Sequence, residues 1–147
     1  VTYTGWCDDD GKLIDDGTVM RFDENCFFVT AAVPSYKWFS QYTRGFEVEL
    51  KDISDDYGIV SLQGPTSRDL INSVADGAIE EIKFFRFLKT KIDGIDCIVS
   101  RTGYTGDLGF EIWVDKNDAC NLWDIMMDKG QVYRILPCGL EVLGWGC

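Results

Sequence analysis

The sequence predicts an α+β fold in which antiparallel sheets carry helices packed on one face. Three observations support this fold class. Short segments of alternating apolar residues are separated by turn signals rich in Asp and Gly. The dipeptide Asp93-Gly94 stands between two such segments, as in a two-residue hairpin. Two runs with apolar residues at helical spacing end at glycines, Gly45 and Gly130.

The first part of the chain has the pattern of an antiparallel meander followed by a helix. Its strands are predicted at residues 3–7, 12–22 and 26–32. A meander of this kind has one buried and one solvated face. Ser35 is the predicted N-cap of the helix, and its aromatic residues, Trp38 among them, are expected to pack as core. A fourth strand is predicted at 46–50, where apolar residues alternate.

The second part adds strands and two helices. Strands are predicted at 59–63, 89–92, 95–100 and 110–114, and helices near 65–74 and 118–130. Gly64 allows a sharp turn from strand to helix, and Pro65 suits the start of a helix because its missing N–H costs nothing there. We expect a single domain over residues 1–147 with two sub-lobes, 1–45 and 46–147.

The composition excludes several classes of function. The net charge of −11 opposes binding to nucleic acid or to an anionic membrane. No apolar run approaches the roughly 18 residues that span a bilayer. The chain has no histidine, which excludes Ser-His-Asp and Cys-His machinery, and no metal site is predicted. The six cysteines form no Cys-x-x-Cys pair, so we expect free, buried thiols in a reducing cytoplasm.

Residues 101–114 are the strongest candidate for a functional site. Three glycines lie between two strand-like segments, where glycine allows a positive φ or the close approach of a ligand to the backbone. Tyr104 lies between two of the glycines, and Glu111 lies on the outgoing strand, out of phase with its apolar neighbours. A glycine-rich hairpin whose polar residues face water is the alternative interpretation.

The wording of this segment, Arg-Thr-Gly-Tyr-Thr-Gly followed by Gly-Phe-Glu-Ile, resembles the signature of the glycine cleavage system T-protein (aminomethyltransferase) family, which includes tetrahydrofolate-dependent demethylases. Ile-Asp-Asp-Gly-Thr at residues 14–18 and Leu-Gln-Gly-Pro at 62–65 resemble further motifs of that family. The resemblance implies part of a T-protein-like, folate-binding fold. Because the chain lacks an initiator Met and family members are more than twice as long, we expect a piece of a longer protein.

The resemblance also implies roles for individual residues. Tyr3, Tyr104 and Glu111 would bind tetrahydrofolate, and Asp16 would face its reactive nitrogens. Asp15 and Asp16 are adjacent on a strand and must point to opposite faces, so only one of them can face a cleft. Tyr104 would act as an acid toward a departing atom, since its hydroxyl can donate a proton. Arg21 is either a clamp for a substrate carboxylate or an exposed strand arginine.

The resembled reaction is one-carbon transfer, in which an aminomethyl or methyl group passes from a small-molecule donor to tetrahydrofolate. Glycine cleavage members take the group from a lipoyl carrier protein, which would then be a partner. The competing class is a non-catalytic folate-binding protein of the same family, of the kind that maintains iron–sulfur clusters. Leu143 stands where we expect a folate-contacting arginine, and this departure fits the competing class.

Overall fold

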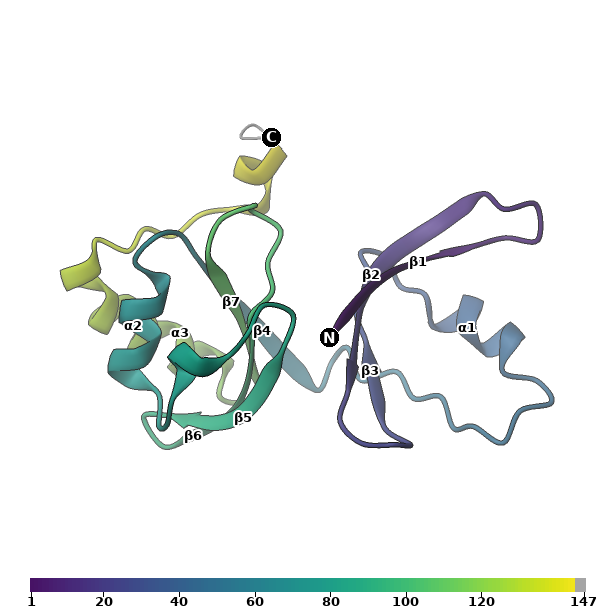
Figure 1. Ribbon diagram of the computed structural model, residues 1–147, viewed down its shortest axis with the longest axis horizontal. Coiled ribbons are helices and arrows are strands. Elements are labelled where there is room, and N and C mark those ends of the chain that lie inside the picture. Colours follow the sequence, from purple (N-terminus) through teal and green to yellow (C-terminus); the bar gives the residue numbers. More distant parts are fainter. Residues whose placement is uncertain (145–147) are drawn as a thin grey trace. The chain divides into compact units, whose positions relative to one another are not determined.

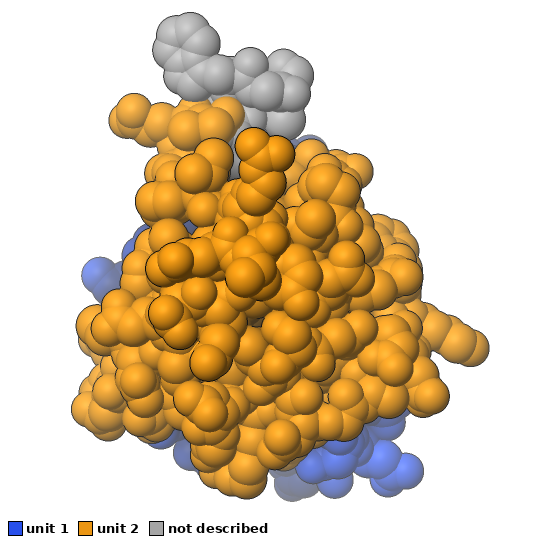
Figure 2. Space-filling model, turned by 90° about the vertical axis from the view of Figure 1, so that its left-hand side faces the viewer, with its two compact units in different colours: residues 1–54 blue, residues 55–147 orange. Residues whose placement is uncertain are grey.

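The computed structural model describes residues 1–144, with side chains described through residue 142. The chain divides into two compact units, residues 1–54 and 55–147, which are coloured separately in Figure 2. The division follows residue 54, whereas the sequence analysis placed it after residue 45. Each unit has a sheet of its own.

The sheet of the first unit is an antiparallel meander in the order β1-β2-β3 (Figure 1). Its strands are β1 (Thr2–Cys7), β2 (Leu13–Arg21) and β3 (Phe27–Val29). The turn between β1 and β2 is made by Asp8, whose carboxylate accepts backbone N–H bonds from Asp10 (3.0 Å) and Lys12 (2.8 Å). Gly11 completes this turn with a φ of +79°. The meander is therefore confirmed, although β3 is shorter than the predicted strand 26–32.

Two expectations for the rest of the first unit are wrong. Helix α1 (Tyr36–Tyr42) follows Ser35 as predicted, but it has no buried residue, and its aromatic rings are half-buried or exposed instead of forming a core. Ser35 donates its hydroxyl to the Val33 carbonyl (3.0 Å) and caps no helical N–H. The predicted strand 46–50 is irregular, with Phe46 71% exposed, because alternating apolar residues form a strand only beside another strand.

The second unit is built on a four-stranded antiparallel sheet in the order β4-β7-β6-β5. Its strands are β4 (Tyr57–Gln63), β5 (Phe87–Ile92), β6 (Ile95–Ser100) and β7 (Gly109–Asp115). The hairpin between β5 and β6 is confirmed: Asp93 and Gly94 have φ values of +49° and +85°, as a type I′ turn requires. β4 pairs with β7, which lies far along the chain, and a pattern of neighbouring residues cannot predict that pairing.

Helices α2 (Ser67–Val74) and α3 (Ala119–Gly130) cover one face of this sheet (Figure 1). The face carries the alternate apolar residues of all four strands, and these pack with both helices and with the short helix η1 (Ile79–Glu81) into one cluster. Its largest fully buried members are Phe110, Leu70, Ile71, Ile79, Ile92, Ile112, Leu122 and Met126. Two further short helices follow, η2 (Gln131–Tyr133) and η3 (Leu140–Gly144). The predicted α+β class with helices on one face is confirmed.

The cysteines within the described residues are free thiols, but most are not buried as expected. Cys97 is buried in the core of the second unit, where its strand faces α2 and α3. The others, Cys7, Cys26, Cys120 and Cys138, are exposed because they lie at the end of a strand, in a turn, in the first turn of a helix and in a connection. Among residues 1–144, no helix has the length and apolar character needed to cross a membrane.

Candidate functional site

The first candidate group lies on the sheet of the first unit, where Tyr3 and Asp16 meet. Gly5 pairs with Asp16 and Tyr3 pairs with Thr18, so Tyr3 and Asp16 are diagonal neighbours on one face of the β1–β2 ladder. The Tyr3 hydroxyl donates a hydrogen bond to the Asp16 carboxylate. Tyr3 is exposed and Asp16 is half-buried. Two residues thirteen positions apart, both assigned to folate binding by resemblance, thus form one hydroxyl–carboxylate pair.

Asp15 points to the opposite face of β2, as the alternation of strand side chains requires. It is 9% exposed, and its carboxylate accepts the backbone N–H of Val33 at 3.1 Å. This bond ties β2 to the segment before α1. Asp15 is therefore a structural residue, which leaves Asp16 as the aspartate that can meet a ligand.

Arg21 shares a sheet face with Asp15 and not with Asp16. It lies opposite Phe27 in the β2–β3 ladder, with its guanidinium carbon 5.8 Å from the ring centroid. Its Nε donates to the backbone carbonyl of Asp23 at 2.9 Å. Arg21 thus makes local contacts at the end of β2, on the sheet face opposite the Tyr3–Asp16 pair.

The second candidate group lies on the face of the β4-β7-β6-β5 sheet that α2 and α3 do not cover. Glu111 is on β7, with Ser61 on β4 and Ser100 on β6 as its ladder partners on either side. Thr102, which is buried, donates its hydroxyl to the Glu111 carboxylate, and its oxygen lies 2.7 Å from the Ser100 hydroxyl oxygen. The Thr102 hydroxyl therefore holds the half-buried carboxylate in one orientation, and the Ser100 hydroxyl contacts Thr102 in turn.

Tyr104 lies in the loop between β6 and β7 and is 79% exposed, so its hydroxyl is available to a ligand. The glycines around it serve two purposes, one of which, a positive φ, was predicted. Only Gly106 of the loop glycines has a positive φ, +72°. A Cβ at Gly103 or Gly109 would lie 2.2 or 1.9 Å from the side-chain amide of Gln63. The group that approaches the backbone at these two glycines is thus a side chain of the protein itself.

Gln63 is the residue that the sequence analysis missed. It stands at the end of β4 opposite Gly109, with its side chain packed over the loop. The available signal was its place in Leu-Gln-Gly-Pro, which was assigned to a turn and not to the site.

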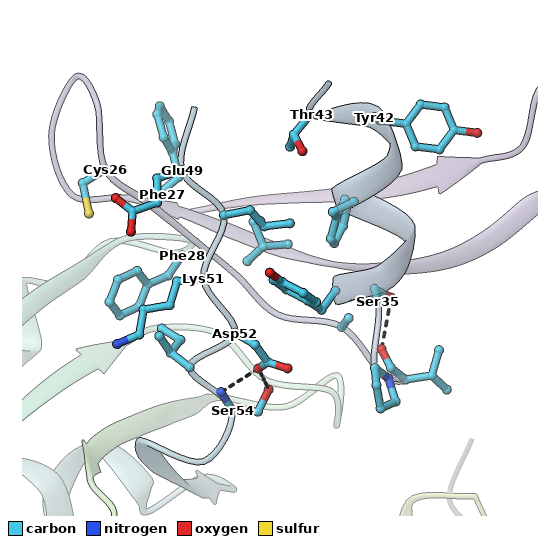
Figure 3. A pocket seen from close by; sticks show the side chains of 18 of the residues that line it. Cys26, Phe27, Phe28, Ser35, Tyr42, Thr43, Glu49, Lys51, Asp52 and Ser54 are labelled. Atoms are coloured by element: carbon cyan, nitrogen blue, oxygen red, sulfur yellow. Dashed lines mark hydrogen bonds between the residues drawn. The ribbon is translucent and has the colours of Figure 1, made fainter. Parts of the chain in front are cut away.

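The first unit also contains a cavity of about 720 Å³ (Figure 3). It is lined by residues of β3, α1 and the 49–54 segment, and none of the predicted site residues lines it. At its edge, the hydroxyl (2.7 Å) and backbone N–H (3.0 Å) of Ser54 donate to Asp52, and these bonds lower the pKa of that carboxyl group. The pKa of the Tyr42 hydroxyl is raised, mainly by partial desolvation and to a smaller extent by the negative charges of Asp9 and Asp8.

Each of the two groups of candidate residues, taken by itself, offers hydrogen-bonding atoms to a polar ligand. Carboxylates that are each held by one hydroxyl retain free acceptor positions for ligand N–H groups. An exposed tyrosine adds a donor and a ring for stacking. The side chain of Leu143, at the expected arginine position, lies outside the described residues, as does all of Trp145 to Cys147.

Comparison with known proteins identifies relatives. The family model of the GCVT N-terminal domain matches residues 1–144. The aminomethyltransferase of Clostridium botulinum (strain Loch Maree / Type A3) is 38% identical and that of Thermoanaerobacter sp. (strain X514) 37% identical, each over 145 residues and 95% of this chain. The chain spans 39% of the length of each of these relatives.

A solved structure shows the same fold. It is the heterotetrameric sarcosine oxidase from Corynebacterium sp. U-96 in complex with pyrrole 2-carboxylate, with a TM-score of 0.67 and 16% sequence identity. The superposition covers 85% of this chain and 64% of that chain. The family match over nearly the whole chain carries the assignment: this chain belongs to the family of the GCVT N-terminal domain.

Proposed function

We propose that this chain is the folate-binding part of an enzyme that transfers a one-carbon unit, aminomethyl or methyl, to tetrahydrofolate. The observation that carries the proposal is the hydrogen bond from Tyr3 to the Asp16 carboxylate. The resemblance assigned these two residues to the folate separately, and they form a pair on one sheet face. Relatives with enzyme names, the aminomethyltransferases, support a transferase over a non-catalytic binding protein.

Tyr3, Asp16, Tyr104 and Glu111 are the proposed folate-binding residues. Tetrahydrofolate supplies the nitrogens that accept the one-carbon unit. Asp16 carries a negative charge that stabilises positive charge developing on those nitrogens. Its hydrogen bond from Tyr3 fixes the direction of the carboxylate, so that no reorientation is needed as the charge develops. Glu111, held by Thr102, accepts N–H groups of the pterin.

Tyr104 is the proposed acid. Its exposed hydroxyl donates a proton to the oxygen, sulfur or nitrogen that leaves the one-carbon unit. Arg21 contributes least, because it lies on the other face of β2 and its Nε is bonded to Asp23; a role in binding the carboxylate of a donor remains a proposal. A small-molecule donor and a lipoyl carrier protein are the proposed partners, in the cytoplasm. The heterotetrameric assembly of the sarcosine oxidase supports partner proteins as a class.

The test is calorimetric titration of tetrahydrofolate into the full-length protein that contains this chain. We expect saturable binding, weakened about tenfold or more by Asp16→Ala, which corresponds to about 1.4 kcal/mol or more. Asp10→Ala is the matched control, since it removes an exposed carboxylate of the β1–β2 turn and should leave the affinity unchanged. Absence of binding by the unaltered protein would refute the folate assignment.

A second experiment separates enzyme from binding protein. The protein is incubated with tetrahydrofolate and ¹³C-labelled methyl or aminomethyl donors, and transfer of the label is followed by NMR. We expect transfer that Tyr104→Phe slows without weakening tetrahydrofolate binding more than a few-fold, because this variant keeps the ring and removes the acid. Binding without transfer from any donor would favour the non-catalytic alternative.

A further inference from the structure

The two motifs of the second unit, Leu-Gln-Gly-Pro and the glycine-rich run, are in contact. The backbone N–H of Gly64 donates to the carbonyl of Leu108 at 2.8 Å. The Ser67 hydroxyl donates to the same carbonyl at 3.2 Å, and Ser67 is buried. The turn from β4 into α2 therefore holds the end of the loop that carries Tyr104.

The carboxamide of Gln63 holds the middle of that loop. Its Nε2 lies 3.4 Å from the carbonyl oxygen of Thr102 and 3.4 Å from that of Phe110, and 3.1 Å from the Ser61 hydroxyl. Its Oε1 accepts the hydroxyl of Thr105 at 3.0 Å. Both ends of the amide are engaged, and its partners come from β4, from the loop and from β7. The side chain thus joins the end of β4 to the loop and to the start of β7, which lie 39 to 47 residues further along the chain.

The glycines of the loop are explained by this packing. Gly103 and Gly109 lack positive φ values, so backbone conformation does not require glycine there. A side chain at either position would overlap the amide of Gln63. Glycine is therefore required at these two loop positions because the Gln63 side chain fills the space beside them.

Thr102 connects Gln63 to the candidate site. Its carbonyl oxygen accepts from Gln63, while its hydroxyl donates to the carboxylate of Glu111. Thr102 is buried, so water cannot readily replace either of these hydrogen bonds. Movement of the loop backbone at Thr102 would also move the hydroxyl that orients Glu111.

We propose that Gln63 is a positioning residue: it fixes the loop of residues 101–108, and through Thr102 it fixes the carboxylate of Glu111 for ligand binding. The ligand part of this inference rests on the proposed function, with tetrahydrofolate as the ligand. Gln63 itself is not a catalytic residue, because it acts through Thr102 and the loop.

The test compares three variants of the full-length protein. Gln63→Glu keeps the shape of the side chain but removes the donor toward the two carbonyls. Gln63→Met removes all the hydrogen bonds without adding a charge. Gln131→Glu adds the same charge at an exposed glutamine of the same unit and serves as the control. Hydrogen–deuterium exchange of residues 102–108 is measured first, followed by titration of tetrahydrofolate at a temperature where all variants are folded.

Both Gln63 variants should raise deuterium uptake of the loop and weaken tetrahydrofolate binding about tenfold, while Gln131→Glu changes neither. A purely structural role would lower the melting temperature without changing affinity in the folded protein, and that result would overturn the proposal. Unchanged loop exchange would overturn it as well. Failure of the unaltered protein to bind tetrahydrofolate would refute the proposed function, and the exchange data would still decide whether Gln63 fixes the loop.

Discussion

The two units of the chain differ in how their sheets are supported. In the second unit, one face of a four-stranded sheet is covered by two helices over a continuous buried cluster. In the first unit, Met20 is the one large apolar side chain that is almost fully buried among the described residues, and Phe27, Val29, Phe46 and Val48 are exposed. A three-stranded sheet with so little buried apolar surface gains little hydrophobic stabilisation of its own.

This difference bears on the two groups of site residues. Glu111 stands on a strand whose other face is packed, so its position is set by the core and by Thr102. Tyr3 and Asp16 stand on a sheet held mainly by its backbone ladder. We therefore expect the Glu111 group to be held rigidly and the strands around the Tyr3–Asp16 pair to open more readily. Hydrogen exchange should be faster throughout the strands of the first unit.

The strongest test of this comparison is Phe110→Ala. Phe110 is completely buried in the core of the second unit, and its truncation should lower the free energy of unfolding by about 3–5 kcal/mol. Phe46→Ala removes the same side chain from the first unit, where it is 71% exposed, and should cost within about 0.5 kcal/mol. Urea denaturation measures both. Equal losses would mean that the Phe46 side chain is packed as well as that of Phe110, so that the first unit would have a core comparable to that of the second.

The parts of the fold that follow from short-range signals were predictable. The Asp93-Gly94 hairpin and the sharp turn at Gly64 depend on residues adjacent in sequence. The predicted strand 46–50 failed because alternation of apolar residues does not specify a neighbouring strand. The pairing of β4 with β7 was unpredictable for the same reason, since its hydrogen bonds join residues far apart in the chain.

Family motifs named the residues of the candidate site, and the structure shows which of those residues contact one another. The Tyr3–Asp16 pair came from family resemblance, and strand alternation correctly required Asp15 to face the other way. Gln63 was missed because its role exists only once β4 lies beside β7. Gly103 and Gly109 were interpreted as openings for a ligand, since the sequence does not reveal which group fills the space over a glycine.

A second test concerns how the first unit is held. A Cβ at Gly17 would lie 1.9 Å from the carbonyl oxygen of Thr30, a residue whose backbone N–H is bonded to the Thr18 carbonyl at 2.9 Å and which therefore cannot move away freely. Gly17→Ala should therefore cost about 3 kcal/mol, at the upper end for overpacking, and should accelerate hydrogen exchange in the first unit alone. Gly139→Ala is the control, because nothing lies within 4 Å of its added Cβ. Faster exchange in both units would show that they unfold together.

A third test uses pH to probe the core of the second unit. Burial raises the pKa of the Cys97 thiol from its ordinary value of 9.0 to about 11. The unfolded chain releases this proton above about pH 9, whereas the folded chain keeps it until about pH 11. Stability should therefore fall as pH rises through this window, by about 1–2 kcal/mol more than in Cys97→Ala. The comparison of the two proteins isolates Cys97 from the lysines and tyrosines that titrate nearby. Identical pH slopes would mean that the thiol is hydrated and the core open at that point.

The smallest expected effect is at the surface of the same unit. Lys91 and Asp96 face each other across the β5–β6 hairpin with Nζ and Oδ1 2.6 Å apart, but their side chains are 48% and 87% exposed. Such pairs contribute little, because water and salt screen the charges. Asp96→Asn should therefore cost less than about 0.5 kcal/mol in urea denaturation at low salt and nothing measurable at 1 M NaCl. A larger loss that salt abolishes would show that surface charge, as well as the buried cluster, distinguishes the second unit from the first.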